Sequence, residues 1–267
     1  MSDERLFPYG DPSEHLAIGR IIRAHSTNPA DVRETALAGL DLSGVRDLLD
    51  LGCGFGFMTQ AAAARCAPGA RVVGVDACAS NESLFRELVT RDGRRAEFVA
   101  MRIASELPWP AASFDAAIAA YSLYFFVEAI PEIARVLRPG GLLLASTHRE
   151  DSLASLLRAL GLPAGRTPLD DLVRRFSAES GAERLRASFG EVRRLDYPNR
   201  LVFGPGDLEE LWRLVVFHLP LLLPAGGAAA GTTAELRERL RASLETAGRL
   251  RIEKSDAVFQ CRRPLCP

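Results

Sequence analysis

An acid and three closely spaced glycines form the first group of residues that could do chemistry. The stretch LLDLGCGFG runs from Leu48 to Gly56, with Asp50 in front of glycines at every second position. If Asp47–Leu51 is a strand and a helix opens at Phe57, the glycines occupy a strand-to-helix turn, where a side chain would block both the turn and a ligand. The pattern predicts a ligand that lies close to the backbone.

The charge and spacing of this motif narrow the chemistry of the ligand. A dinucleotide fingerprint would read GxGxxG, which differs from the spacing behind Asp50. A carboxylate repels a phosphate at close range and attracts a cationic amine. Asp76 ends the next predicted strand, where it can accept hydrogen bonds from a ribose diol. A nucleoside with an ammonium group fits both acids, although an Asp at such a turn can also cap the helix or bond backbone N–H groups.

The elements around these residues alternate between short apolar runs and Ala-rich helical segments. Between Val45 and His148 this alternation is typical of βα units around a parallel sheet. We expect strands at 47–51, 71–76, 96–101, 115–121 and 141–148, and helices at 57–66, 83–91 and 126–137. Further on we expect helices at 151–160, 168–176, 182–189, 208–223 and 232–248, and strands at 191–198 and 255–263.

Three domain-like regions follow from this pattern. Residues 1–43 show helical apolar spacing and are expected to form a flap against the core, and residues 44–150 form the α/β core. Residues 151–267 complete the sheet and carry helical cap insertions at about 151–180 and 206–250. Within the second insertion, a flexible AGGAAAG linker separates the two long helices.

Composition excludes several classes of protein. The 267 residues are 48% hydrophobic and 25% charged with a net charge of -1, which indicates a globular protein and argues against nucleic acid as a partner. The start has no secretory pattern, and the most apolar stretch, Leu211 to Ala225, is too short and too interrupted to span a membrane, so we expect a cytoplasmic protein. Five cysteines without metal-ligand spacing argue against disulfides and against a zinc site, so no metal is expected.

These motifs together resemble the class I S-adenosylmethionine-dependent methyltransferases that act on small molecules. DLGCGFG is similar to the first motif of that family, and SELPWPAASFDAAIAAYSLYFF followed by EIARVLRPGGLLLAS is similar to its fourth-strand region and the helix and strand that follow. The resemblance covers roughly residues 40 to 150 and implies a Rossmann-like, seven-stranded, mostly parallel sheet with helices on both faces. It implies S-adenosylmethionine as cofactor. Under this reading the cofactor-binding residues are Asp50, Gly52, Cys53, Gly54, Gly56, Asp76, Ala77, Cys78, Ile103, Ala104 and Tyr121.

The sequence departs from the family at the adenine site. Where an acidic residue usually contacts the adenine amine, the register places Ile103 or Ala104. We expect a backbone N–H near Ala104 to replace it, with Ile103 and Cys78 packing on the ring and Ser105 as the nearby polar alternative.

Methyl transfer requires alignment of donor and acceptor, and a base only where the acceptor must lose a proton. His148 ends the fifth predicted strand and is the candidate base, with a backbone hydrogen bond or a helix cap as its alternative role. Tyr121 and Tyr124 are expected to face the methyl group, although ordinary core packing also explains them. The catalytic candidates are His148, Tyr121 and Tyr124, and the substrate-pocket candidates are Tyr9, Tyr124, Phe125, Trp212 and His218.

The predicted function is transfer of a methyl group to an O, N or C centre of a small hydrophobic or aromatic metabolite. The alternatives are a S-adenosylmethionine-binding partner or regulatory module without turnover, and RNA or protein methylation. The balanced charge and the sequence AAYS, in place of an NPPY-type clamp, speak against the last of these.

Overall fold

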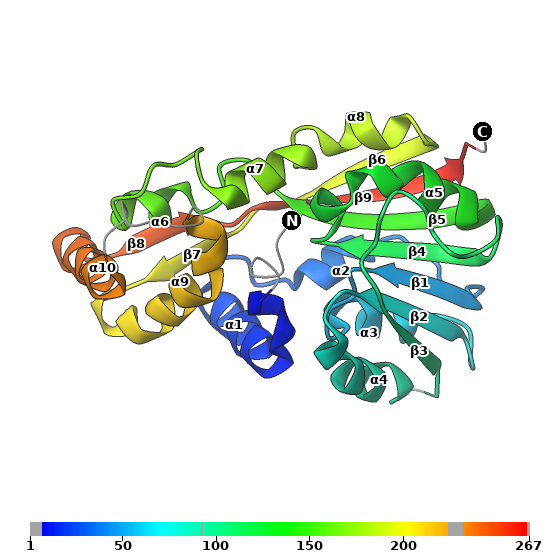
Figure 1. The fold of residues 1–267 in the computed structure, drawn as a ribbon, viewed down its shortest axis with the longest axis horizontal. Coiled ribbons are helices and arrows are strands. Elements are labelled where there is room, and N and C mark those ends of the chain that lie inside the picture. Colours follow the sequence, from blue (N-terminus) through cyan, green and yellow to red (C-terminus); the bar gives the residue numbers. More distant parts are fainter. Residues whose placement is uncertain (1–6, 92, 224–231, 266–267) are drawn as a thin grey trace. The chain divides into compact units, whose positions relative to one another are not determined.

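Seven strands form one sheet in the order β3-β2-β1-β4-β5-β9-β6 (Figure 1). The structure is a computed structural model that describes residues 7–91, 93–223 and 232–265. Strands β1 to β5 pair in parallel, and β9 pairs antiparallel with both β5 and β6. The predicted seven-stranded, mostly parallel sheet is therefore confirmed. Its strands are β1 (Asp47–Leu51), β2 (Arg71–Asp76), β3 (Arg95–Ala100), β4 (Phe114–Ala120), β5 (Leu137–His148), β6 (Phe189–Tyr197) and β9 (Asp256–Pro264).

The chain divides into two units, which we call the sheet unit and the helical unit. The sheet unit contains Ala30–His148, Arg175–Tyr197 and the chain from Asp256 onward. The helical unit contains the described residues up to Pro29, together with Arg149–Arg174 and Pro198–Ser255. The region expected as one flap, 1–43, is thus shared between the units.

Helices cover both faces of the sheet in the sheet unit (Figure 1). One face buries side chains of α2, α3 and α4 against strand residues such as Leu48 and Val72. On the opposite face α8 approaches so closely that a Cβ at Gly181 would lie 2.6 Å from the Phe259 ring. These helices are α2 (Val32–Ala36), α3 (Phe57–Ala63), α4 (Glu82–Thr90), α5 (Ile130–Val136) and α8 (Gly181–Arg186).

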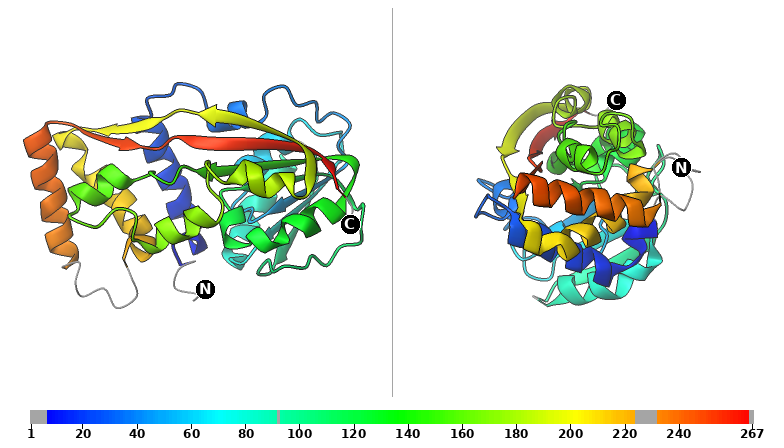
Figure 2. Two further views of the ribbon diagram at one scale, coloured as in Figure 1. Left: turned by 90° about the horizontal axis from the view of Figure 1, so that it is seen from above. Right: turned by 90° about the vertical axis from the view of Figure 1, so that its left-hand side faces the viewer.

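The helical unit has an apolar core of its own. Leu211 and Leu214 of α9 pack with Leu240 of α10 and with Leu201 of a small strand pair, β7 and β8. Figure 2 shows α10 alongside α9. The mutual packing of these elements buries the nearly all-apolar helix expected at 208–223. The elements are α1 (Pro12–His25), α6 (Ala154–Ala159), α7 (Pro168–Arg175, which ends at the unit boundary), β7 (Arg200–Phe203), α9 (Leu208–Leu222), α10 (Thr233–Ala247) and β8 (Leu250–Glu253).

Local chemistry fixes the ends of several helices. Asp11 caps α1 by accepting the backbone N–H groups of Ser13 and Glu14. Thr232 and Glu235 form a reciprocal capping box at the start of α10, and Gly248 ends that helix with φ of 64°. None of the described helices is both long and apolar enough to cross a membrane.

Some predicted boundaries were wrong. The helix expected at 126–137 is two pieces, a 3-10 turn at Val127–Ala129 and α5, because Leu137 already belongs to β5. The helix expected at 182–189 ends at Arg186, since Phe189 pairs with Pro264 in the sheet. Strands β7 and β8 were not predicted, and the AGGAAAG linker lies outside the described residues.

Candidate active site

The glycine turn follows β1 and leads into α3. Gly52, Gly54 and Gly56 all have positive φ, at 71°, 50° and 96°, a backbone region that side chains disfavour. A Cβ at Gly52 would lie 2.5 Å from the Cβ of Ser122, so no larger residue fits. The N–H groups of Gly52 and Cys53 donate to the carbonyl of Val75 at 2.8 and 3.0 Å, which ties the turn to β2.

Asp76 stands at the end of β2 with its carboxylate held by backbone donors. Its Oδ2 accepts the N–H of Gly54 at 2.8 Å, and its Oδ1 accepts the N–H of Cys78 at 2.8 Å. Asn81 adds a longer bond of 3.4 Å to Oδ1. Burial raises the pKa of Asp76, and the backbone bonds oppose that shift. The carboxylate is therefore fixed beside the glycine turn, as the sequence predicted for a group that binds a ribose diol.

Asp50 is buried beneath the same turn. The hydroxyl of Thr59 in α3 donates to its Oδ2, while Oδ1 has no hydrogen-bond partner among the described residues. Burial raises the pKa of Asp50 to about 7 from 3.8, the Thr59 bond lowers it, and the negative charge of Asp76 raises it further. Asp50 thus ties the turn to α3 through the Thr59 hydroxyl.

His148 and an unpredicted partner, Asp256, lie opposite each other in the register between β5 and β9. Nδ1 of His148 lies 2.7 Å from Oδ1 of Asp256, whose side chain is only 3% exposed. A carboxylate can only accept, so Nδ1 carries the proton and the lone pair of the neutral ring belongs to Nε2. This contact orients the imidazole at the carboxyl end of β5.

Tyr121 completes this cluster directly after β4. Its hydroxyl donates to Oδ2 of Asp256 at 2.8 Å, and its ring stacks on His148 with centroids 4.8 Å apart. Its φ of 56° is unusual for a bulky residue and is a strain typical of functional sites. Burial, the charge of Asp256 and the hydrogen bond to it raise the pKa of Tyr121 well above its ordinary value, so the hydroxyl stays protonated.

Two more aromatic candidates belong to the same part of the sheet unit. Tyr124 is buried, its ring centroid lies 6.3 Å from that of His148, and Phe125 packs against it at 4.8 Å. Sequence reasoning therefore selected three aromatic or imidazole side chains that the structure brings together. It missed Asp256, which no local motif marks.

The remaining cofactor candidates follow β2 and β3. Cys53 is buried within the turn, Cys78 is half-buried, and Ala77 is exposed. Ile103 is half-buried and Ala104 exposed, in a stretch without regular structure after β3. The adenine contacts of Ile103 and Ala104 stay a prediction.

Three substrate-pocket candidates lie in the helical unit. Tyr9 packs edge-on against Phe217 with centroids 5.7 Å apart, and Trp212 packs on the apolar core of that unit. Nδ1 of His218 lies 2.8 Å from the carbonyl of Leu214 in the same helix. These contacts give all three a packing role, and their contact with substrate stays a prediction.

Comparisons with known proteins support the same reading. Residues 49–145 match a family model described as a methyltransferase domain. A trans-aconitate 2-methyltransferase from Paracidovorax citrulli is 36% identical over 48% of this chain and 47% of its own length. An uncharacterized methyltransferase from Mycobacterium tuberculosis is 30% identical over 57% of this chain and 60% of its own. A nocamycin O-methyltransferase from Saccharothrix syringae is 36% identical over 36% and 35%. The chain thus spans from about a third to three fifths of the curated relatives it matches.

Solved structures share the fold. The YcgJ protein of Bacillus subtilis aligns with a TM-score of 0.53 and 18% identity, over 94% of this chain and 99% of that one. The 4+2 cyclase SpnF aligns with a TM-score of 0.52 and 24% identity, over 88% and 81%. Because a cyclase has this fold too, the fold alone leaves the reaction open.

The ordered motifs, the strand order and the matched domain define a class of protein. Residues 49–145 form a methyltransferase domain of the class I S-adenosylmethionine-dependent type, with S-adenosylmethionine as the cofactor of that domain. Its residues fit that cofactor: the glycine turn excludes side chains, Asp50 has a buried oxygen that no described residue hydrogen-bonds, and Asp76 presents a fixed carboxylate.

Proposed function

We propose that this protein transfers a methyl group from S-adenosylmethionine to a small-molecule acceptor. Two neighbouring groups of residues carry the proposal. The glycine turn and Asp76 follow β1 and β2, and the Tyr121, His148 and Asp256 cluster lies at the ends of β4 and β5 and the start of β9. All of these residues belong to the sheet unit. The acceptor is an O, N or C centre of a hydrophobic or aromatic metabolite.

The glycine turn and the two acids around it are the proposed cofactor site. When bound, the cofactor supplies an electrophilic methyl group on a cationic sulfur. Gly52 and Gly54 let the ligand approach the backbone, and Asp76 accepts from the ribose hydroxyls. Asp50 is buried beneath the turn. Its negative charge stabilises the cationic amino-acid end of the cofactor from that position.

His148 is proposed to remove the proton of the acceptor. When the acceptor takes the methyl group that the bound cofactor would supply, the acceptor proton would pass to Nε2 of His148. Asp256 then stabilises the resulting imidazolium through Nδ1. Tyr124 and the partly exposed Phe125 are the proposed walls for an apolar acceptor in this unit.

The names of two relatives support a small acceptor. One is named for trans-aconitate and another for the O-methylation of nocamycin. The formal net charge of -1 gives no field that would favour a nucleic acid acceptor. Methylation of RNA or protein is therefore the weaker alternative.

The first test is calorimetric titration with S-adenosylmethionine, with NADH as the control ligand, on the wild type and on Asp76→Ala. We expect the wild type to bind S-adenosylmethionine and not NADH, and we expect Asp76→Ala to lose the binding of S-adenosylmethionine. A screen of small phenols, carboxylic acids and amines then follows, read by mass spectrometry as the gain of one CH2. Binding without any methylated product would favour the non-catalytic binding module, whereas NADH binding would refute the cofactor assignment.

A further inference from the structure

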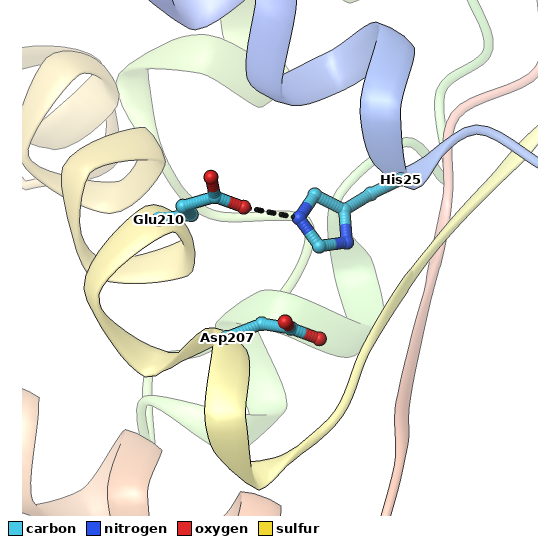
Figure 3. A group of neighbouring side chains, drawn as sticks. All are labelled: His25, Asp207 and Glu210. Atoms are coloured by element: carbon cyan, nitrogen blue, oxygen red, sulfur yellow. Dashed lines mark hydrogen bonds and ion pairs between the residues drawn. The ribbon is translucent and has the colours of Figure 1, made fainter.

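A second cluster of ligand-bearing side chains lies entirely in the helical unit, apart from the residues used above. His25 ends α1, Asp207 precedes α9, and Glu210 lies in its first turn (Figure 3). One potential ligand atom from each residue lies within 4.8 Å of those of the other two. In Figure 3 the Glu210 carboxylate points at the His25 ring and the Asp207 carboxylate lies beside it, although His25 is far from both acids in the sequence.

The imidazole of His25 is fixed in one orientation by the rest of the unit. Its Nδ1 lies 2.9 Å from the carbonyl of Val202, and its ring stacks on Phe203 with centroids 4.0 Å apart. The side chain is only 12% exposed. A carbonyl only accepts, so Nδ1 carries a proton and Nε2 is directed at the carboxylates. Metal-binding histidines are oriented in this way, with one nitrogen on a backbone carbonyl and the other on the ion.

Two carboxylates lie near the His25 ring, and one of them contacts Nε2. Oε2 of Glu210 lies 2.5 Å from Nε2. One oxygen of Asp207 accepts the N–H of Gly204 at 2.7 Å, which holds that carboxylate in place. The lone pair of a neutral imidazole would repel the Glu210 oxygen at this distance. The contact therefore needs either a proton between these two atoms, on the ring or on the carboxyl group, or a metal ion that all three groups share.

We propose that His25, Asp207 and Glu210 bind a divalent first-row transition-metal ion. One imidazole nitrogen and two carboxylate oxygens suit Zn²⁺ or Mn²⁺, and two negative charges balance a dication. In a tetrahedral site neighbouring ligand atoms lie about 3.3 Å apart. The potential ligand atoms of this cluster lie within 4.8 Å of one another, so small side-chain movements would give that spacing. The Glu210 side chain is 54% exposed and can rotate to reach it. The ion would connect the end of α1 to the start of α9.

The test uses the full-length chain without a histidine tag, treated with a chelator and then titrated with Zn²⁺. We expect one ion per chain and a rise in the midpoint of thermal unfolding, because a ligand that binds only the folded state stabilises it. Glu210→Gln and His25→Gln should each weaken binding at least tenfold and abolish the rise. Mg²⁺ should bind weakly, since it prefers an all-oxygen shell.

Glu209→Gln is the matched control, because it removes the same charge from the neighbouring position of α9, where Glu209 pairs with Arg237. It should change the Zn²⁺ affinity less than twofold. Cobalt(II) absorption, which reports the number and geometry of ligands, should change in Glu210→Gln and not in Glu209→Gln. Wild-type protein that binds no Zn²⁺, or a Glu210→Gln variant that binds it equally well, would overturn the proposal and leave a protonated His25–Glu210 ion pair.

Discussion

Asp50 and Asp256 are both buried in the sheet unit, yet their carboxylates are satisfied in different ways. Asp256 receives the Tyr121 hydroxyl on one oxygen and the His148 ring on the other. Asp50 receives only Thr59, and its second oxygen lacks a partner among the described residues. A carboxylate with protein donors on both oxygens positions other side chains. One with a buried orphan oxygen is costly until a ligand arrives, so its environment is complete only in the complex.

The largest effect on cofactor binding is expected at the glycine turn, which Asp50 and Asp76 both support. Gly52→Val would place a Cβ 2.5 Å from Ser122 at a φ of 71°. We expect loss of S-adenosylmethionine binding by more than a hundredfold, measured by calorimetry. Gly69→Val, at a glycine with a φ of 69° and open space around it, is the control for backbone strain alone. Equal losses in both variants would mean that strain, and not the closed turn, governs binding.

The role of Asp256 as a positioning residue is tested by Asp256→Asn, which keeps the shape and removes the charge. Because the amide no longer stabilises an imidazolium at His148, we expect kcat to fall about a hundredfold while the affinity for S-adenosylmethionine changes little. The measurements are steady-state kinetics against pH and calorimetry of the cofactor. A proportional loss of cofactor affinity would instead assign Asp256 to the fold of the cofactor site.

A smaller effect is expected at Asp50, where Asp50→Asn should lower the affinity for S-adenosylmethionine about tenfold. The free energy of unfolding of the ligand-free variant should instead rise relative to that of the wild type as pH increases. Because the pKa of Asp50 is about 7 when folded and 3.8 is its ordinary value, the folded chain holds more protons between these values. The wild type therefore loses stability as pH rises through this range, and the variant does not.

Thermal unfolding of the ligand-free proteins at about pH 5 and about pH 8 measures this difference. We expect Asp50→Asn to gain in midpoint relative to the wild type at the higher pH. Thr59→Val, which removes the hydroxyl donor to Asp50, is the matched variant. It should lower the unfolding midpoint below that of the wild type, because the Asp50 carboxylate loses its hydrogen bond. A pH-independent difference between wild type and Asp50→Asn would mean that the carboxyl titrates normally.

Much of the cofactor half of the site could be predicted from the sequence, because its parts are local. The turn lies within one strand–turn–helix segment, and Asp76 follows at the end of the next strand. His148 was predicted from the same logic of strand ends. Asp256 was not, because its place depends on the antiparallel pairing of β9 with β5 across 108 positions of sequence. Strands β7 and β8 were missed since they are short and lie beside strongly helical segments.

The division of the chain between units also bears on how the protein folds as it is synthesised. The helical unit is built from three separate segments, the last of which ends at Ser255. The residues of the glycine turn leave the ribosome early, with the first parallel strands, whereas Asp256 follows the final crossing between units. A nascent chain therefore acquires the elements of the cofactor site long before it can pair β9 with β5. A chain truncated before β9 would lack the partner of His148, so the proposed His148–Asp256 pair is completed after the parallel strands have formed.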